Sequence, residues 1–182
     1  MTGLLPFKQI DPSQVTLRMM TAESQVPSLL QSEIFKRCFS CLDLTSLGVL
    51  DSVMSVREIA QKTADFKIHF PDVPQVAAIC VYPELVEVAG LVLGESEVAI
   101  AAAAGGFPSS HSFLEVKMLE CAMAEENGAD EIDMVMNLGE FRDGNNEVVA
   151  GEIKTIRGEL DAETRLKVII ESGLMPSLSD VY

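Results

Sequence analysis

The stretch RLKVIIESG, residues 165–173, decides how the rest of the chain is interpreted. Its apolar side chains at 166 and 168–170 are typical of a strand that is buried on both faces of a parallel sheet. Lys167 interrupts this apolar run, although lysine is almost never fully buried unless its charge is paired. We therefore expect a strand whose lysine has either a specific partner or a chemical role.

Similar apolar stretches recur upstream and alternate with helical patterns. The expected strands lie near residues 41–44, 76–82, 97–104, 131–136 and 166–171. Capping-box patterns that begin at Ser55 and Ser112, and a proline at position 83, predict the starts of helices between them, and residues 147–160 form a further helical pattern. Strands alternating with helices predict an α/β protein built of β/α units around a parallel sheet.

The spacing of the strands indicates which α/β architecture is present. From Asp43 to Lys167 the chain spans 124 residues in four repeats, about 31 residues each. Eight such units need about 250 residues, the usual size of a TIM (β/α)8 barrel. The 182 residues have room for only five units, which leaves a five-stranded open α/β domain or a barrel that stops partway. We expect an N-terminal arm over 1–40 and a partial barrel domain over 41–182.

Composition and charge limit the function classes. The net charge of −15 argues against a general nucleic-acid binder, which needs basic residues to neutralise phosphates. The sequence contains no run of 18 apolar residues, so we expect no membrane span. Its N-terminus lacks the basic segment and long apolar core of a secretory signal, so we expect a cytoplasmic protein. Cys38 and Cys41 form a C-x-x-C spacing without a second pair, and we interpret them as reduced cysteines rather than a metal site.

Charged residues within the expected strands are the candidate functional groups. Asp43, Asp133 and Lys167 each lie in a different strand, and in a barrel the inward side chains of different strands converge. A lysine in such a place suggests imine chemistry, because a neutral amine attacks a carbonyl. We expect burial or a second cation to lower the pKa of Lys167, and a carboxylate to shuttle protons.

Structural roles for the same residues remain open from the residues alone. Lys167 could extend to solvent or form a structural ion pair with Asp133, and Asp43 could cap a turn. Cys80 fits a packing cysteine better than a nucleophile, because no histidine is close in sequence. Residues 105–110 (GGFPSS) could be a phosphate-binding nest or a strand-to-helix turn.

Five segments together resemble one family, deoxyribose-phosphate aldolase, a class I aldolase. They occur in the family's order and spacing: 41–47 (CLDLTSL), 78–83 (AICVYP), 106–108 (GFP), 128–135 (GADEIDMV) and 166–173 (LKVIIESG). The resemblance implies a TIM barrel and the reversible cleavage of 2-deoxyribose 5-phosphate to acetaldehyde and glyceraldehyde 3-phosphate. It requires no metal or other cofactor, because the imine activates the substrate.

The resemblance also assigns roles to residues. Lys167 aligns with the lysine that forms the Schiff base, and Asp133 with the proton-relay carboxylate. Asp43, Thr45, Cys80 and Ser172 align with the substrate-binding surroundings, where Ser172 replaces a common threonine.

Part of the family pattern is absent from these 182 residues. The K-T-S-T-G strand with its second lysine and the late G-x-S-S segment that holds the substrate phosphate do not occur. We therefore expect a C-terminally truncated aldolase with weak or no turnover, or alternatively a non-catalytic fragment or assembly subunit that needs a partner to complete the barrel.

Unpaired strand edges at both ends of the sheet also predict a homo-oligomer, in the simplest case a dimer. An unrelated open domain of flavodoxin type would instead place a ligand at residues 105–110.

Overall fold

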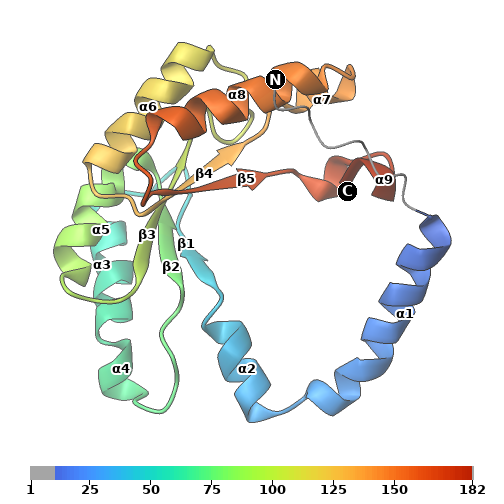
Figure 1. The fold of residues 1–182 in the computed structure, drawn as a ribbon. Coiled ribbons are helices and arrows are strands. Elements are labelled where there is room, and N and C mark those ends of the chain that lie inside the picture. Colours follow the sequence, from blue (N-terminus) through green and yellow to red (C-terminus); the bar gives the residue numbers. More distant parts are fainter. Residues whose placement is uncertain (1–10, 182) are drawn as a thin grey trace. The chain divides into compact units, whose positions relative to one another are not determined.

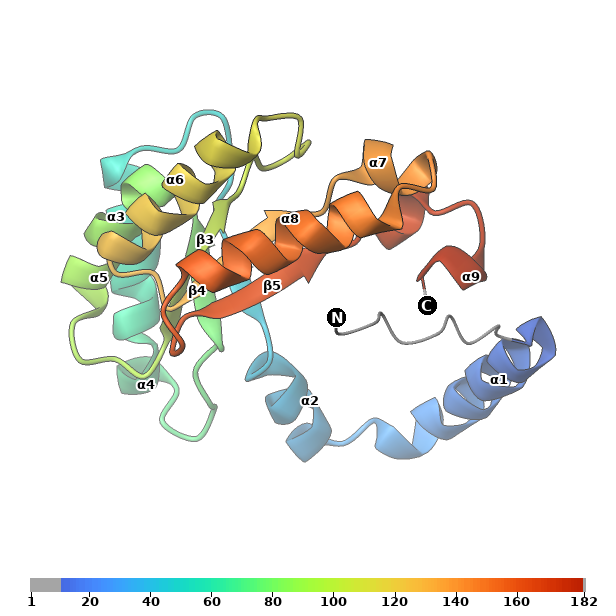
Figure 2. The same ribbon diagram turned by 45° about the horizontal axis from the view of Figure 1, so that its top comes forward.

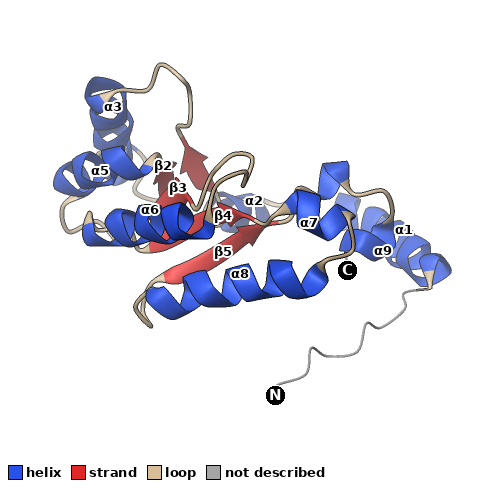
Figure 3. Ribbon diagram, turned by 90° about the horizontal axis from the view of Figure 1, so that it is seen from above, coloured by secondary structure: helices blue, strands red, loops and turns tan. Residues whose placement is uncertain are grey.

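The protein was analysed as a computed structural model that describes residues 11–181 and divides them into two compact units (Figure 1). The larger unit, Lys36–Ile170, contains the sheet. The other unit combines residues 11–35 with 171–181 and contains α1 (Pro12–Leu29), η2 (Ser172–Leu174) and α9 (Leu178–Val181) (Figure 3). The predicted arm over 1–40 is helical at α1 and α2 (Ser32–Phe39), and its first ten residues lie outside the described part.

The sheet consists of five parallel strands in the order β1-β2-β3-β4-β5. Their bounds are β1 Asp43–Thr45, β2 Ala78–Val81, β3 Ala99–Ala104, β4 Glu131–Val135 and β5 Arg165–Ile169. All five predicted strands are confirmed, with ends that shift by no more than two residues. Consecutive strands that are neighbours in the sheet follow the strand order of a barrel, whereas a doubly wound domain reverses its order.

The helices that connect the strands occur where the sequence predicts them, but their starts differ. The bounds are α3 Val53–Ala64, α4 Phe66–His69, η1 Pro83–Leu85, α5 Val86–Leu93, α6 Leu114–Glu126, α7 Leu138–Arg142 and α8 Asn146–Glu159. The predicted cap at Ser55 is wrong: Ser52 is the N-cap of α3, and Ser55 closes the capping box from the third helical position. The predicted capping box at Ser112 does not form either, since α6 begins after Phe113 without a side-chain cap.

One face of the sheet is covered by α3, α5, α6 and α8, and this interface is the hydrophobic core (Figure 2). Ile79 of β2 and both Ile132 and Met134 of β4 belong to this core and are completely buried. Alternate residues of each strand therefore supply the core, and the residues between them point to the opposite, inner face. None of the helices described over residues 11–181 is long and apolar enough to cross a membrane.

The inner face is built differently, from small and charged side chains. Ala78, Cys80, Ala101 and Ala103 form a small buried cluster on it. The expectation that every strand is buried on both faces holds for β2 but fails at the two edges, since β1 and β5 are partly exposed. The charged side chains of these edge strands, Asp43 and Lys167, are accordingly each 31% exposed.

Candidate active site

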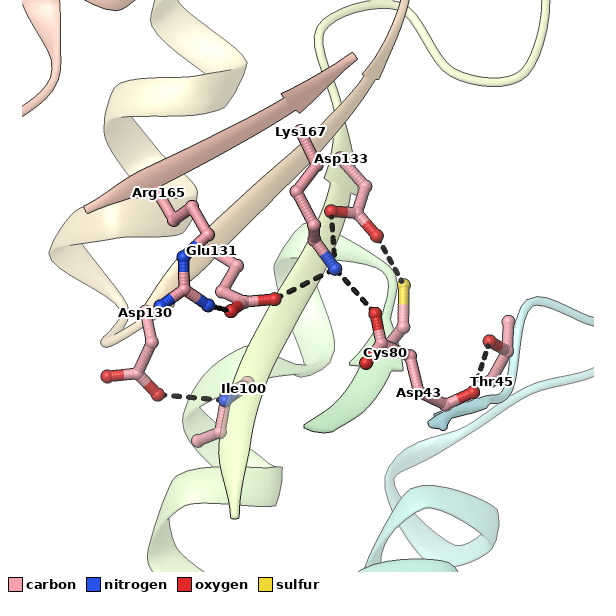
Figure 4. Close-up of polar contacts among 9 residues, drawn as sticks. All are labelled: Asp43, Thr45, Cys80, Ile100, Asp130, Glu131, Asp133, Arg165 and Lys167. Atoms are coloured by element: carbon pink, nitrogen blue, oxygen red, sulfur yellow. Dashed lines mark hydrogen bonds and ion pairs between the residues drawn. The ribbon is translucent and has the colours of Figure 1, made fainter. Parts of the chain in front are cut away.

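Lys167 lies at the centre of the polar side chains on the inner face (Figure 4). Its Nζ atom is 2.5 Å from Oδ2 of Asp43, 2.8 Å from Oε2 of Glu131 and 3.0 Å from Oδ1 of Asp133. The lysine side chain is 31% exposed, so the ammonium group is partly shielded but still reachable from solvent. Three carboxylates thus surround one amine.

The strand register explains why these groups meet. Asp133 pairs with Lys167 across β4 and β5, and Glu131 pairs with Arg165 two residues earlier, so all four side chains share the inner face. Asp43 comes from β1, at the opposite edge of the sheet from β5. Its direct contact with Lys167 requires the five strands to curl around the inner face, as the strands of a barrel do. The predicted convergence of Asp43, Asp133 and Lys167 is therefore observed.

The charge state of Lys167 differs from the expectation. Burial works to lower the pKa of Lys167, but hydrogen bonds and charge attraction from Asp43 and Asp133 outweigh it and raise the pKa above its ordinary value. The expectation of a lowered pKa is wrong for this chain, because the effect of Asp43 and Asp133 exceeds that of burial. In the resting site Lys167 is an ammonium ion.

Asp133 and Cys80 form the more buried side of the site. Burial raises the pKa of Asp133, although hydrogen bonding and charge attraction from Lys167 oppose that rise. The Sγ atom of Cys80 is 3.7 Å from Oδ2 of Asp133. Burial, together with the charge of Asp133, raises the pKa of the Cys80 thiol to about 12. Cys80 is therefore a neutral thiol at physiological pH, which agrees with a packing cysteine and not with a nucleophile.

Glu131 is a member of the site that the sequence analysis did not identify. Its side chain is buried, and its two oxygens contact different cations: Oε1 pairs with Arg165 and Oε2 with Lys167. The signal that could have revealed it is the alternation along β4, because Glu131 and Asp133 are two residues apart and so point to the same face.

Thr45, another predicted site residue, makes its side-chain hydrogen bond within its own strand and not with Lys167. Thr45 is exposed, and its hydroxyl donates to the backbone carbonyl of Asp43 at 3.2 Å. Ser172 belongs to the other unit of the chain, so its assignment to the site remains a prediction.

Residues 105–110 form a turn rather than a phosphate nest. The N–H of Gly106 donates to the carboxylate of Glu120 at 2.8 Å, and the N–H of Ser110 donates to the carbonyl of Gly106 at 2.8 Å. A carboxylate already occupies the place where an anion would bind. Among the described residues, no group of three or more His, Cys, Asp or Glu side chains is arranged to hold a metal ion, and all four cysteines are free.

Fold and site together define an α/β protein with five units of the barrel type and a lysine held by carboxylates on the inner face. Comparison with known proteins leads to the same class. The chain is 42% identical over 98 residues to deoxyribose-phosphate aldolase of Metamycoplasma hominis, covering 54% of this chain and 44% of that protein. It is 29% identical over 157 residues to deoxyribose-phosphate aldolase of Bos taurus, covering 80% of this chain and 49% of that protein.

A solved structure described as QR15, an aldolase, shares the fold. It superposes with a TM-score of 0.65 at 26% identity, covering 75% of this chain and 57% of that one. No family model matches the chain. The chain is thus similar to the deoxyribose-phosphate aldolases, as its five motifs predict, and it spans about half the length of the curated relatives it matches.

Proposed function

We propose that this chain carries the imine-forming site of a deoxyribose-phosphate aldolase, with Lys167 as the amine and Asp133 as the proton-relay carboxylate. The observation that carries the proposal is that Lys167 of edge strand β5 contacts Asp43 of the opposite edge strand β1 and two carboxylates of the neighbouring strand β4, at 2.5 to 3.0 Å from its Nζ atom. In this proposal the substrates are acetaldehyde and a small phosphorylated aldehyde, which the enzyme joins reversibly to give 2-deoxyribose 5-phosphate. Asp43, Thr45, Cys80 and Ser172 are proposed to line the substrate site.

The geometry supports the proton transfers that imine formation needs. Lys167 is held as an ammonium ion, so a proton must first pass to a carboxylate or to solvent before the nitrogen lone pair can attack the carbonyl carbon. Asp133 is suited to accept it, because burial disfavours its ionised form. The tetrahedral adduct then loses its oxygen as water, which requires a proton from a neighbouring acid, and protonated Asp133 can return one.

A second candidate function is a non-catalytic assembly subunit. Two observations favour it: within the described residues β1 and β5 each have a strand neighbour on one side only, and the carboxylates keep Lys167 protonated. Pairing of such edges with another chain would also account for the proposed homo-oligomer, in the simplest case a dimer. A cytoplasmic location is part of the proposal and is supported by the four free cysteines.

The test is reductive trapping with acetaldehyde and borohydride, followed by peptide mass mapping. We expect the reduced two-carbon adduct to form on Lys167 much faster than on Lys154, an exposed lysine of α8 that serves as an internal control. The variant Lys167→Met should abolish the fast adduct, and Lys154→Met should leave it unchanged. Labelling of Lys167 at or below the rate of Lys154 would support the assembly subunit instead.

A further inference from the structure

A second lysine of interest, which is buried, lies outside the site. Lys117 of α6 is completely buried, and its Nζ atom is hydrogen-bonded to Oγ of Ser110 at 2.7 Å and to both carboxylate oxygens of Glu152 in α8 at 2.9 Å. Removing one partner of such a buried pair leaves an uncompensated charge, whereas apolar residues of similar volume often replace the whole pair without loss. Stability alone therefore does not explain why a lysine occupies this position.

The contacts of Lys117 and its neighbour Glu120 hold the segment between β3 and α6 at both ends. Glu120 accepts the N–H of Gly106 at 2.8 Å, and Lys117 donates to the side chain of Ser110. Gly106 packs so closely on Lys117 that an added Cβ would lie 3.3 Å from its Cε atom. Ser110 is buried and has a φ of +60°, a conformation that non-glycine residues rarely adopt, so it needs a fixed partner. Residues 106–110 are hereafter called the clamped turn.

The clamped turn carries Phe107 onto the inner face of the sheet. Phe107 packs against the small cluster that contains Cys80, the residue whose thiol contacts Asp133. Its ring also meets the edge of Tyr82 at a centroid distance of 6.4 Å, and the hydroxyl of Tyr82 donates to the carbonyl of Leu47 at 3.0 Å. The segments that follow β1, β2 and β3 are thus joined through Phe107 at the carboxyl ends of the strands, where barrel enzymes bind substrates.

We infer that Lys117 is a positioning residue for the proposed reaction: through Ser110 and Glu152 it fixes the clamped turn, and thereby holds Phe107 as the apolar wall beside Cys80 and Asp133. This inference rests on the proposed function, because the wall would matter by binding the short apolar end of an aldehyde. A wall of this kind affects how tightly the aldehyde is held near Lys167 and leaves the amine itself unaltered. The binding of the aldehyde and the reactivity of the amine can be measured separately.

The test uses two variants that remove the contact between Lys117 and Ser110 in different ways. Ser110→Ala deletes only the hydroxyl, and the double variant Lys117→Met with Glu152→Leu removes both charges but keeps the volume filled. The matched control is Ser112→Ala, which deletes an exposed hydroxyl just outside the clamped turn. Circular dichroism and thermal unfolding of each variant establish that the protein compared is folded.

Two readouts are measured on each folded variant. The first is the rate at which iodoacetamide alkylates Cys80, mapped by peptide mass spectrometry, and the second is the acetaldehyde concentration that gives half-maximal trapping at Lys167. Loss of a hydrogen bond to a charged group changes an equilibrium constant by about tenfold to a hundredfold. We expect both readouts to rise by at least about tenfold while the limiting trapping rate stays unchanged. The control should match the wild type in both.

The outcomes separate this inference from the proposed function. If the wild type forms no adduct at Lys167, the proposed function fails, and the alkylation of Cys80 still reports whether the clamped turn covers the inner face. If either folded variant alkylates Cys80 at the rate of the control, the inference is overturned even when Lys167 is fully reactive. A change in the limiting trapping rate without a change in half-saturation would also overturn it, because a positioning wall does not alter the amine.

Discussion

Replacing Glu131 with glutamine should make Lys167 more reactive. The substitution keeps the shape of the side chain and removes one negative charge from a position 2.8 Å from the Lys167 Nζ atom. Coulomb's law at this distance gives about 1.5 kcal/mol even at the dielectric constant of water, and about 6 kcal/mol at the value typical of partly buried pairs. Since about 1.4 kcal/mol equals one pKa unit, the pKa of Lys167 should fall by at least about one unit.

The sign follows from the surroundings of the amine. Asp43 and Asp133 raise the pKa of Lys167 above its ordinary value. Glu131 also lies 2.8 Å from the Nζ atom, so by Coulomb's law the loss of its negative charge should lower that pKa. Arg165 loses its carboxylate partner at the same time, and its charge then repels the ammonium form instead of being neutralised by Glu131. Below the pKa, each unit of decrease raises the neutral fraction of the amine about tenfold, and the rate of attack on a carbonyl rises with it.

Competitive labelling with acetic anhydride measures this effect without relying on aldolase activity. The extent of acetylation of Lys167 is followed by peptide mass spectrometry across the alkaline range, and its midpoint gives the pKa. The control is Glu163→Gln, which removes an exposed carboxylate from the turn before β5. A midpoint in the Glu131→Gln variant equal to or above that of the control would refute the reasoning that Glu131 holds the proton on Lys167.

Three further predictions concern the charge of Lys167, the burial of Cys80 and the packing of the core. Folding raises the pKa of Lys167 above 10.5, so the stability that its charge contributes is present below that pH and is lost as the pH rises through the pKa of the folded state. The free energy of unfolding measured with urea should therefore fall at strongly alkaline pH, and Lys167→Met should lessen that fall. Because the pKa of Cys80 is about 12, iodoacetamide at pH 8 should modify the exposed Cys38 and Cys41 well before Cys80, and equal rates in the folded protein would contradict the buried thiol. Ile132→Ala deletes a completely buried side chain of β4 and should lower the free energy of unfolding in urea by about 2–5 kcal/mol, whereas Val148→Ala on the exposed side of α8 should lower it far less.

Local patterns predicted the strands well because both the apolar runs and the charges within them are read directly from the chain. Asp43, Asp133 and Lys167 each interrupt such a run, and the assumption that parallel strands share an inner face was enough to bring them together. The helix starts were predicted less well. Ser52 and Ser55 are three residues apart, so either can open a capping pattern, and only the backbone conformation distinguishes them.

The contacts that were missed are nonlocal. The burial of Lys117 depends on Glu152 of α8, 35 residues later in the sequence, whose carboxylate pairs with the Lys117 Nζ atom. Glu131 lies at the first position of its strand, where a charged residue usually marks the strand end, and its role depends on the register that places Arg165 and Lys167 beside it. The alternation along β4 places Glu131 on the inner face, but only the pairing of β4 with β5 shows which cations it contacts.

The balance of charge around Lys167 is what separates a resting site from a reactive one. Three carboxylates face Lys167 and Arg165, and one of them, Glu131, is shared between the two cations. Any change that neutralises a carboxylate or adds a cation near Glu131 must lower the pKa of Lys167, whichever element supplies it. The imine chemistry proposed for this chain therefore depends less on the position of Lys167, which the strand register already fixes, than on how many negative charges remain within 3 Å of its nitrogen.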